Sequence, residues 1–374
     1  MIINYPRMRR RVKGWPNDLD TALEFASPEV FSISAPKNWD GKLEYTNGSG
    51  WNTWDGSEIT AGEIGGNHCI YLRGTGNSKI TGSYSARWNV TGVNIACNGD
   101  IDRLLDYTTV KKGKRPRMAN YCYQSMFSGC TSLTTAPSLP ATTLASSCYQ
   151  SMFYGCTGLT TAPSLPATTL ANYCYRYMFQ NCTSLTTAPL LPATTLSNFC
   201  YSSMFYGCSN LTTAPSLPAT TLASSCYTYM FYGCTSLTTA PSLPATTLTN
   251  YCYNYMFYGC TSLTTAPSLP ATTLTDFCYT SMFYGCSNLT TAPSLPATTL
   301  ASSCYNSMFR DCKKIKLSTT ASGTYTKAYR IPKSGTGTTA SGALNSMFAN
   351  TGGTFKGTPK INTTYYLDES NTIV

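Results

Sequence analysis

Cysteine, a nucleophile and metal ligand, occurs eighteen times in this chain. Sixteen of them recur at a 26-residue interval, in two series offset by eight positions. The first series is Cys122, Cys148, Cys174, Cys200, Cys226, Cys252, Cys278 and Cys304, and the second is Cys130, Cys156, Cys182, Cys208, Cys234, Cys260, Cys286 and Cys312. Structural zinc sites place paired cysteines two to four residues apart, whereas cysteines eight apart on a helix lie about 12 Å apart. We therefore interpret both series as buried, reduced packing residues, with disulfides between repeats and a metal site as alternatives.

Catalysis has little support among the remaining residues. A cysteine–histidine nucleophile pair would need His68, the one histidine, to lie beside Cys69 or Cys97. No pair of carboxylates suggests glycoside hydrolysis either. We predict a protein that is not an enzyme and needs no cofactor.

The cysteines belong to a repeat with eight units over residues 119–312, of which residues 145–170 read ASSCYQSMFYGCTGLTTAPSLPATTL. Counted from the first cysteine, the apolar residues of CYxxMFxGC stand at offsets 0, 1, 4, 5 and 8, which fit one face of a helix. Glycine at offset 7, replaced by Asn181 and Asp311 in two units, suits a left-handed helix end. The following SLTTA predicts a short strand and the proline-containing PSLPA a loop, with Leu133, Leu139 and Leu144 pointing inward. The repeat thus predicts an α/β solenoid with a 26-residue period.

Among the eight copies the core offsets barely change, whereas offsets −1, +2, +3 and +6, which on a helical wheel lie opposite the core face, do change. Tyrosine, serine, asparagine and threonine dominate there, a composition typical of antibody paratopes rather than of a solvated helix face. Drift at exposed positions is the alternative. The predicted binding residues are Tyr173, Arg176, Tyr177, Tyr206, Tyr229, Tyr232, Tyr251, Tyr255, Tyr258 and Tyr284.

The net charge of +10 comes from two short segments. Five basic residues lie in residues 111–117, and the other five are Arg7, Arg9, Arg10, Arg11 and Lys13. Without these ten, 16 basic residues balance 16 acidic ones. Because the excess charge lies in a terminus and a linker rather than along a face, nucleic-acid binding is disfavoured. We predict instead that the N-terminal basic residues anchor the chain to a partner.

The segments on either side of the repeat do not follow the 26-residue pattern. We divide the chain into a basic arm (1–18), a small all-β sandwich (19–110), a basic linker (111–118), the eight repeats (119–312) and a C-terminal cap (313–374) with one degenerate repeat at residues 343–348. In the sandwich Trp39, Trp51, Trp54 and Trp88 form either part of the core or a second, carbohydrate-binding site. The sequence contains no run of about 20 apolar residues, so we predict no membrane insertion. It also contains no apolar stretch after the first arginines, so we predict no secretory signal.

Units such as MFYGCTSLTTAPSLPATTL, together with the closing GTYTKAYRIP…MFANTGGTF…INTTYY, resemble the BspA-like leucine-rich repeats. These occur in surface proteins of gut Bacteroidales and in proteins of their bacteriophages. The resemblance implies an adhesin or recognition module. Since no export signal is visible, it favours a structural protein on the virion surface, a fibre or decoration protein. Such a protein would attach to other virion proteins through its arm and sandwich, and bind a host surface protein or glycan through the solenoid. A bacterial cell-surface adhesin is the alternative, and the sequence leaves homo-oligomerisation open.

Overall fold

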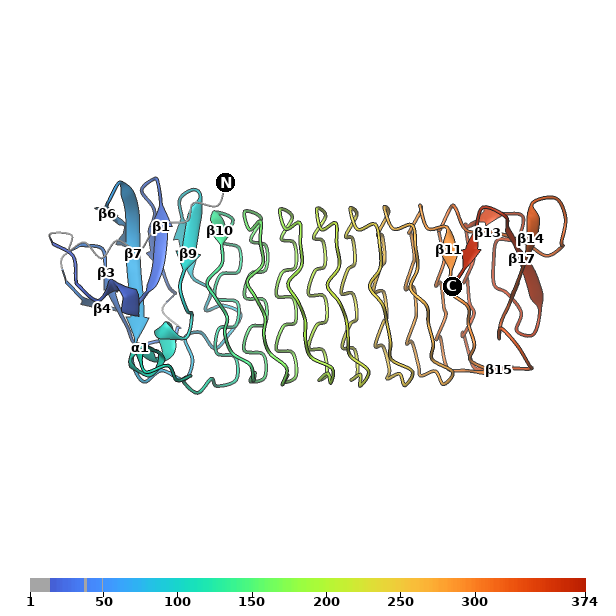
Figure 1. Ribbon diagram of the computed structural model, residues 1–374, viewed down its shortest axis with the longest axis horizontal. Helices are drawn as coiled ribbons and strands as arrows, with labels where there is room; N and C mark the ends of the chain where they lie inside the picture. The colour runs from blue at the N-terminus through green and yellow to red at the C-terminus, as the bar shows by residue number, and fades with distance from the viewer. Residues whose placement is uncertain (1–13, 37–38, 49) are drawn as a thin grey trace.

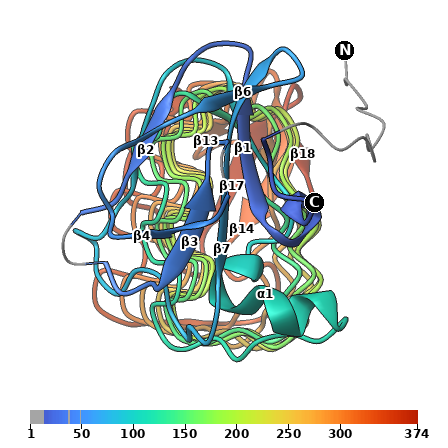
Figure 2. The ribbon, with the colours of Figure 1, turned by 90° about the vertical axis from the view of Figure 1, so that its left-hand side faces the viewer.

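A computed structural model describes residues 14–36, 39–48 and 50–374 of the chain. The molecule is elongated, with a β-rich block at each end and a series of similar rungs between them (Figure 1). Viewed along its length, the rungs nearly superpose on one another (Figure 2). The eight repeats therefore stack as a solenoid, in which each unit contacts its two neighbours.

The CYxxMFxGC segment is not a helix, so the prediction of an α/β repeat is wrong on this point. Alternate amides donate to the carbonyl three residues earlier, as Met126 N does to Tyr123 O at 3.2 Å, which is the hydrogen bond of a β-turn. The amides between them donate to the next rung, as Phe127 N does to Met152 O at 3.0 Å. The segment is a spiral of successive β-turns whose remaining amides join the rungs.

Backbone dihedral angles explain why a helix does not form. Every fourth residue of the segment has a positive φ, for example Ser147 (55°), Ser151 (55°) and Gly155 (68°). A left-handed residue cannot continue a right-handed helix. The left-handed conformation predicted at offset 7 is present, with φ of 60° at Asn181 and 61° at Asp311, but offsets −1 and +3 share it.

Threonines form the two other hydrogen-bonded edges of each rung. At the LTTAP corner Thr135 makes a parallel bridge to Thr161, and at the ATTL corner Thr143 bridges Thr169. Apart from β10 (Leu133–Thr135) and two short strands near the end, these contacts are single bridges rather than strands. One proline follows the LTTAP bridge and another precedes the ATTL bridge, as Pro137 and Pro140 do in the first unit, and both lack the amide that a wider ladder needs.

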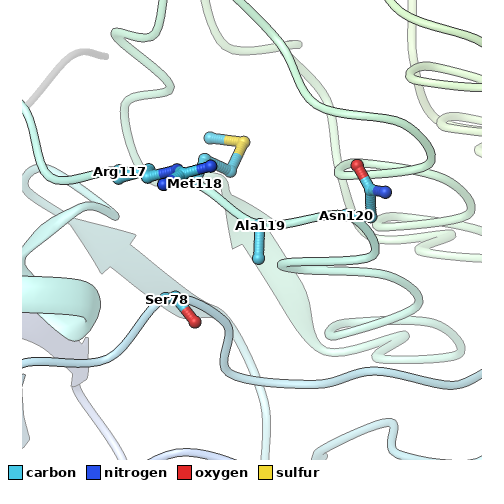
Figure 3. Close-up of a pocket in the computed structure, with 5 residues that line it drawn as sticks. All are labelled: Ser78, Arg117, Met118, Ala119 and Asn120. Atoms are coloured by element: carbon cyan, nitrogen blue, oxygen red, sulfur yellow. The ribbon is translucent and has the colours of Figure 1, made fainter.

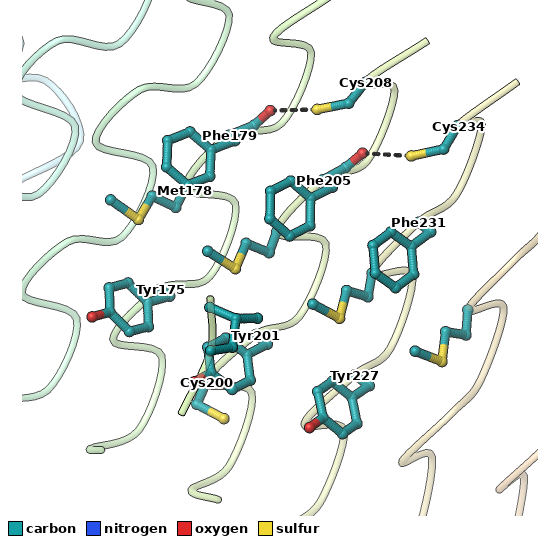
Figure 4. Close-up of a cluster of buried hydrophobic side chains, with 14 of the residues drawn as sticks. Tyr175, Met178, Phe179, Cys200, Tyr201, Phe205, Cys208, Tyr227, Phe231 and Cys234 are labelled. Atoms are coloured by element: carbon teal, nitrogen blue, oxygen red, sulfur yellow. Dashed lines mark hydrogen bonds between the residues drawn. The ribbon is translucent and has the colours of Figure 1, made fainter. Parts of the chain in front are cut away.

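The interior consists of parallel columns of identical side chains. Figure 4 shows the tyrosines at offset +1 and the phenylalanines at offset +5, stacked from rung to rung. Centroids are 5.8 Å apart between Tyr201 and Tyr227, and 5.7 Å apart between Phe205 and Phe231. The second cysteine series packs beside them, and Cys234 Sγ donates to Phe205 O at 3.1 Å (Figure 4). The predicted inward leucines Leu133, Leu139 and Leu144 are buried, and so are their equivalents in the other units except Leu170, which is half-buried.

The N-terminal block contains two sheets, one of seven strands in the order β10-β9-β1-β7-β3-β4, with β6 paired to β7, and one of three in the order β5-β2-β8. Its strands are β1 (Leu23–Ser27), β2 (Ser32–Ser34), β3 (Leu43–Thr46), β4 (Asn52–Trp54), β5 (Ile59–Thr60), β6 (Gly62–Ile64), β7 (Asn67–Gly74), β8 (Asn89–Thr91) and β9 (Ile95–Asn98). A short 3-10 helix, η1 (Leu19–Thr21), precedes them. The region predicted as all-β also contains helix α1 (Arg103–Lys111), which ends inside the predicted linker.

Part of this block caps the first rung. The segment between β7 and β8 imitates a rung, because Ile80 N donates to Cys122 O at 2.9 Å and Trp88 N donates to Met126 O at 2.8 Å. Strand β9 then pairs in parallel with β10 of the first repeat. These bonds satisfy amides and carbonyls that an uncapped end would expose.

The C-terminal block closes the other end in the same way. Residues 343–349 continue the turn spiral after the eighth repeat, and Phe309 N donates to Met347 O at 2.9 Å. The ring of Phe348 extends the phenylalanine column at 5.4 Å from Phe309. The remaining strands are β11 (Thr291–Ala292), β12 (Thr299–Leu300), β13 (Lys316–Ser318), β14 (Tyr325–Arg330), β15 (Thr338–Thr339), β16 (Gly352–Gly353), β17 (Thr364–Asp368) and β18 (Thr372–Ile373). They form the sheet β14-β17-β13-β16 and the pairs β11-β18 and β12-β15.

Candidate recognition surface

A column of four tyrosines at offset +6 runs along one face of the solenoid. Centroid distances are 4.4 Å from Tyr206 to Tyr232, 4.5 Å from Tyr232 to Tyr258 and 4.4 Å from Tyr258 to Tyr284, with interplanar angles of 1°, 5° and 17°. All four are half-buried, because each ring covers its neighbour. The guanidinium of Arg310 lies 5.4 Å from the Tyr284 ring and ends the column.

A second column at offset +3 lies beside the first. Tyr229 and Tyr255 stack at 4.8 Å, and each contacts the offset +6 tyrosine of its own rung, Tyr232 at 6.0 Å and Tyr258 at 5.9 Å. We call the six residues of these two columns the tyrosine strip: Tyr206, Tyr229, Tyr232, Tyr255, Tyr258 and Tyr284.

Other predicted residues form smaller groups at offset −1 and near Arg176. Tyr251 stacks on Phe277 at 4.8 Å. Arg176 lies against three rings, with its guanidinium carbon 5.5 Å from Tyr173, 4.4 Å from Tyr177 and 5.5 Å from Phe199. Tyr177 also accepts a 2.5 Å hydrogen bond from this guanidinium. The ten predicted residues are thus on the solenoid surface, but they form three separate groups.

The side chains at offset +2 do not face outward, contrary to the helical-wheel prediction. Gln124 and Gln150 are 3% and 4% exposed and are joined by a 3.2 Å hydrogen bond between their amides. Thr228 is also buried, and its hydroxyl donates to Tyr251 O at 2.5 Å. The prediction fails because a turn spiral alternates its side chains differently from a helix. Arg176, at the same offset, is accordingly half-buried.

The pKa of three tyrosines of the strip is raised above the ordinary value, so the hydroxyls of Tyr229, Tyr232 and Tyr284 stay protonated at neutral pH. Desolvation, together with the neighbouring Tyr206 and Tyr258, raises the pKa of Tyr232 to about 12. Desolvation also raises the pKa of Tyr229 and of Tyr284, the latter despite the opposing charge of Arg310. The six side chains of the strip include no carboxylate, ammonium or guanidinium group, so the strip offers hydroxyls and aromatic faces that bind through stacking and hydrogen bonds.

Three outward tyrosines were not among the predicted residues. Tyr121 and Tyr154 are 46% and 38% exposed. Both belong to the variable offsets, so the pattern contained the signal for them. Tyr84, 55% exposed, comes from the capping segment of the N-terminal block, and no repeat pattern marks it.

The candidate catalytic and metal-binding groups do not form a reactive site in the described part of the chain. Desolvation, with Glu24 nearby, raises the pKa of Cys69 to about 12 and also raises that of Cys97, which is the opposite of an activated nucleophile. All eighteen cysteines are buried with free thiols. Among the described residues, no three histidine, cysteine or carboxylate side chains come close enough to hold a metal ion.

The tryptophans of the N-terminal block are mainly core. Trp54 and Trp88 are buried, and Trp39 packs against Trp54 at 5.0 Å. Trp51 is half-buried under the guanidinium of Arg73, 3.8 Å from its ring. These contacts favour the packing interpretation over a second carbohydrate site.

Figure 3 shows a hollow of about 420 Å³ where the chain enters the first rung. Ser78, Arg117, Met118, Ala119 and Asn120 line it. It offers one charged side chain and no aromatic face, so it resembles a junction between two segments more than a binding site.

The predicted anchoring residues Arg7, Arg9, Arg10, Arg11 and Lys13 lie outside the described residues. Among the residues that the structure does describe, no helix has the length and apolar character needed to cross a membrane.

Short stacked rungs with buried leucines and two capped ends define a leucine-rich-repeat solenoid. A family model, the BspA type leucine rich repeat region, matches in six copies over residues 105–238 and 201–330, more than half of the chain. The chain therefore belongs to the BspA-type leucine-rich-repeat family. Repeats of this family suggest use in surface or protein recognition, and the family is typically non-enzymatic. No curated protein and no solved structure matches the chain.

Proposed function

We propose that this protein is a non-enzymatic recognition protein that binds a host surface protein or glycan through the tyrosine strip. One observation carries the proposal most directly. Tyr229 and Tyr255 have φ of 57° and 55°, a conformation that costs a non-glycine residue roughly 1–2 kcal/mol. The third left-handed offset of the same rungs uses Gly233 and Gly259 instead. The same conformation holds serine at offset +3 of five other rungs, so the turn does not require an aromatic residue there. Aromatic side chains kept at solvent-accessible positions that the fold does not demand favour a binding role over a structural one.

The composition of the strip supports the same interpretation. Tyrosine supplies a large contact area with little side-chain entropy to lose, and neighbouring stacked rings restrict it further. Truncation of a buried aromatic anchor at an interface often costs about 2 kcal/mol or more. We expect the central four tyrosines, Tyr229, Tyr232, Tyr255 and Tyr258, to contribute most to the affinity.

The test replaces these four tyrosines with serine, which already occupies offset +3 in other rungs. Binding of the labelled protein to a panel of gut Bacteroidales cells should fall at least roughly thirtyfold. The matched control changes four exposed threonines of the same rungs, Thr238, Thr246, Thr264 and Thr272, to serine and should bind normally. Unchanged binding by the tyrosine variant would assign the strip to surface drift.

We further propose that the protein acts on a virion surface as a fibre or decoration protein, held by its N-terminal arm and first β block. Family membership is equally compatible with a bacterial cell-surface adhesin. Mass spectrometry of purified virions separates the two, because only the virion protein co-purifies in fixed stoichiometry with capsid and tail proteins. Deletion of residues 1–18 should abolish this incorporation while the solenoid remains folded, and unchanged incorporation would refute the anchoring role.

A further inference from the structure

The outer columns of side chains are interrupted at the first two rungs. At offset +3, where Tyr177 stands in the third rung, the first two carry Ser125 and Ser151. The missing rings leave a hollow of about 400 Å³, within the range of small-molecule sites. Its lining residues are Tyr84, Ser125, Ser128, Ser151, Tyr154, Tyr177 and Gln180.

The wall formed by Tyr84 is fixed to the solenoid. The segment that carries it donates from Thr81 Oγ1 to Gln124 O at 2.8 Å and from Trp88 N to Met126 O at 2.8 Å, on either side of the tyrosine. The Tyr84 hydroxyl also accepts a hydrogen bond from the amide of Gln150. This ring is held in place before any ligand arrives.

The opposite wall, Tyr177, is fixed by Arg176. The guanidinium both donates to the Tyr177 hydroxyl at 2.5 Å and lies 4.4 Å from its ring. Arg176 forms no ion pair with a carboxylate of the described residues. Two rings from different parts of the chain therefore face one hollow, and Tyr154 adds a third that is 38% exposed.

The chemistry of the lining selects a ligand class. Three aromatic rings, three serine hydroxyls and one amide line the hollow, and no carboxylate, ammonium, guanidinium or imidazole group is among the lining side chains. A metal ion or a phosphate would lack a charged ligand, and an apolar peptide side chain would leave the serines and Gln180 without partners. A sugar ring satisfies both kinds of group, because its C–H face packs on aromatic rings while its hydroxyls exchange hydrogen bonds with serine, tyrosine and glutamine.

We propose that this hollow binds a pyranose ring of a glycan, with Tyr84, Tyr154 and Tyr177 as its aromatic walls. The inference rests on the proposed function, since it names a ligand for the same face, but it places a binding site at the N-terminal end of the solenoid, away from the tyrosine strip.

The test uses the full chain on an array of neutral and carboxylate-bearing glycans, followed by titration of the best-binding glycan. Ser151→Tyr fills the hollow with the residue that other rungs carry at this offset, and it should weaken binding at least tenfold. Its matched control is Ser281→Tyr. That variant also places a tyrosine at offset +3 of a rung with tyrosine at offset +6, but far from the hollow, and it should bind like the parent.

A second variant distinguishes loss of the binding site from a folding defect. Tyr84→Ser removes one wall at an exposed position, and it should also weaken glycan binding at least tenfold while the thermal unfolding midpoint stays unchanged. The proposal is overturned if no glycan binds the parent protein, or if Ser151→Tyr and Tyr84→Ser both bind as the parent does. If either of these two results is obtained and the quadruple strip variant still loses cell binding, the proposed function is retained and only the glycan site in the hollow is rejected.

Discussion

The solenoid contains two kinds of aromatic column, an inner and an outer one. Both consist of stacked rings, but they differ in burial and in the number of rungs that contribute to them. The inner tyrosines, from Tyr123 to Tyr305, occur in all eight rungs, are at most 1% exposed and stack at 5.7–5.8 Å. The outer column from Tyr206 to Tyr284 occupies four rungs, is half-buried and stacks at 4.4–4.5 Å. Stacking alone therefore does not assign a role. Burial and variation between copies separate the columns that build the fold from those available for binding.

The largest expected effect is a difference in stability between variants of two adjacent residues, one in an inner column and one in the outer column. Phe231→Ala removes a fully buried ring from an inner column and should lower the free energy of unfolding by about 3–5 kcal/mol. Tyr232→Ser, next to it in the outer column, should cost less than about 1 kcal/mol. Urea unfolding followed by circular dichroism measures both. Equal losses would show that the outer column is as structural as the inner one.

The second largest expected effect is a pH dependence of the stability, which comes from Asp102 at the N-terminal end of the inner tyrosine column. Asp102 is 2% exposed and lies 3.3 Å from the Tyr123 hydroxyl. Desolvation and the nearby Asp100 raise its pKa to about 6, despite the opposing charge of Arg115. Since the folded pKa exceeds the ordinary value of 3.8, the protonated form is the one that folding favours. This stabilisation is complete below about pH 4 and disappears as the pH rises to about 6.

Asp102→Asn removes this penalty, so it should raise stability at pH 7 by about 3 kcal/mol, at about 1.4 kcal/mol per pKa unit. The variant and the parent should be equally stable near pH 3.5. Unfolding midpoints measured from pH 3.5 to 7.5 test the difference between the two proteins. A difference that does not change with pH would contradict the assignment.

Removal of a tyrosine hydroxyl from the inner column should change the stability by a smaller amount, and the sign of the change should differ between two positions. The Tyr201 hydroxyl is buried without a hydrogen-bond partner, whereas that of Tyr123 donates to Ile101 O at 3.2 Å. Tyr201→Phe should therefore stabilise the protein by roughly 1 kcal/mol, and Tyr123→Phe should destabilise it by about the same amount. Thermal unfolding of the two single variants is sufficient, and a loss of stability in Tyr201→Phe would indicate a partner for its hydroxyl.

The smallest signal is expected from the cysteines. Burial raises the pKa of Cys174, Cys182 and Cys252 to about 12, so at pH 8 almost no thiolate is present. Iodoacetamide should leave the native protein unmodified, and the unfolded protein should take up eighteen labels without prior reduction. Mass spectrometry counts the labels, and a count near two would show that most of the repeat cysteines are in disulfides.

The sequence predicted the repeat and its inward leucines because identical residues at a fixed interval must occupy equivalent places. It did not predict the turn spiral. Apolar offsets of 0, 1, 4, 5 and 8 fit a helix of 3.6 residues per turn, and they also fit a left-handed residue at every fourth position. Gly155 signals that conformation, but Ser147 and Ser151, with the same positive φ, do not.

The candidate site was predictable to the same extent. The tyrosines of the strip follow from variation between copies, and Tyr154 belongs to the same pattern. The inward direction of Gln150 depends on how the turns alternate, which requires the backbone. Tyr84 reaches the first rungs only because the chain folds back as a cap, and nothing within a repeat indicates that contact.

The turn spirals join successive rungs through the same backbone hydrogen bonds at every step, and the two end blocks differ from the rungs. Insertion or deletion of one 26-residue unit would therefore add or remove one whole rung. Each rung changes the reach of the protein by about 4.8 Å. It also changes the order in which tyrosine and serine alternate along the outer face, while both caps still fit. The length of the molecule and the pattern of its outer face would thus change together, while the stacking of the interior columns is kept.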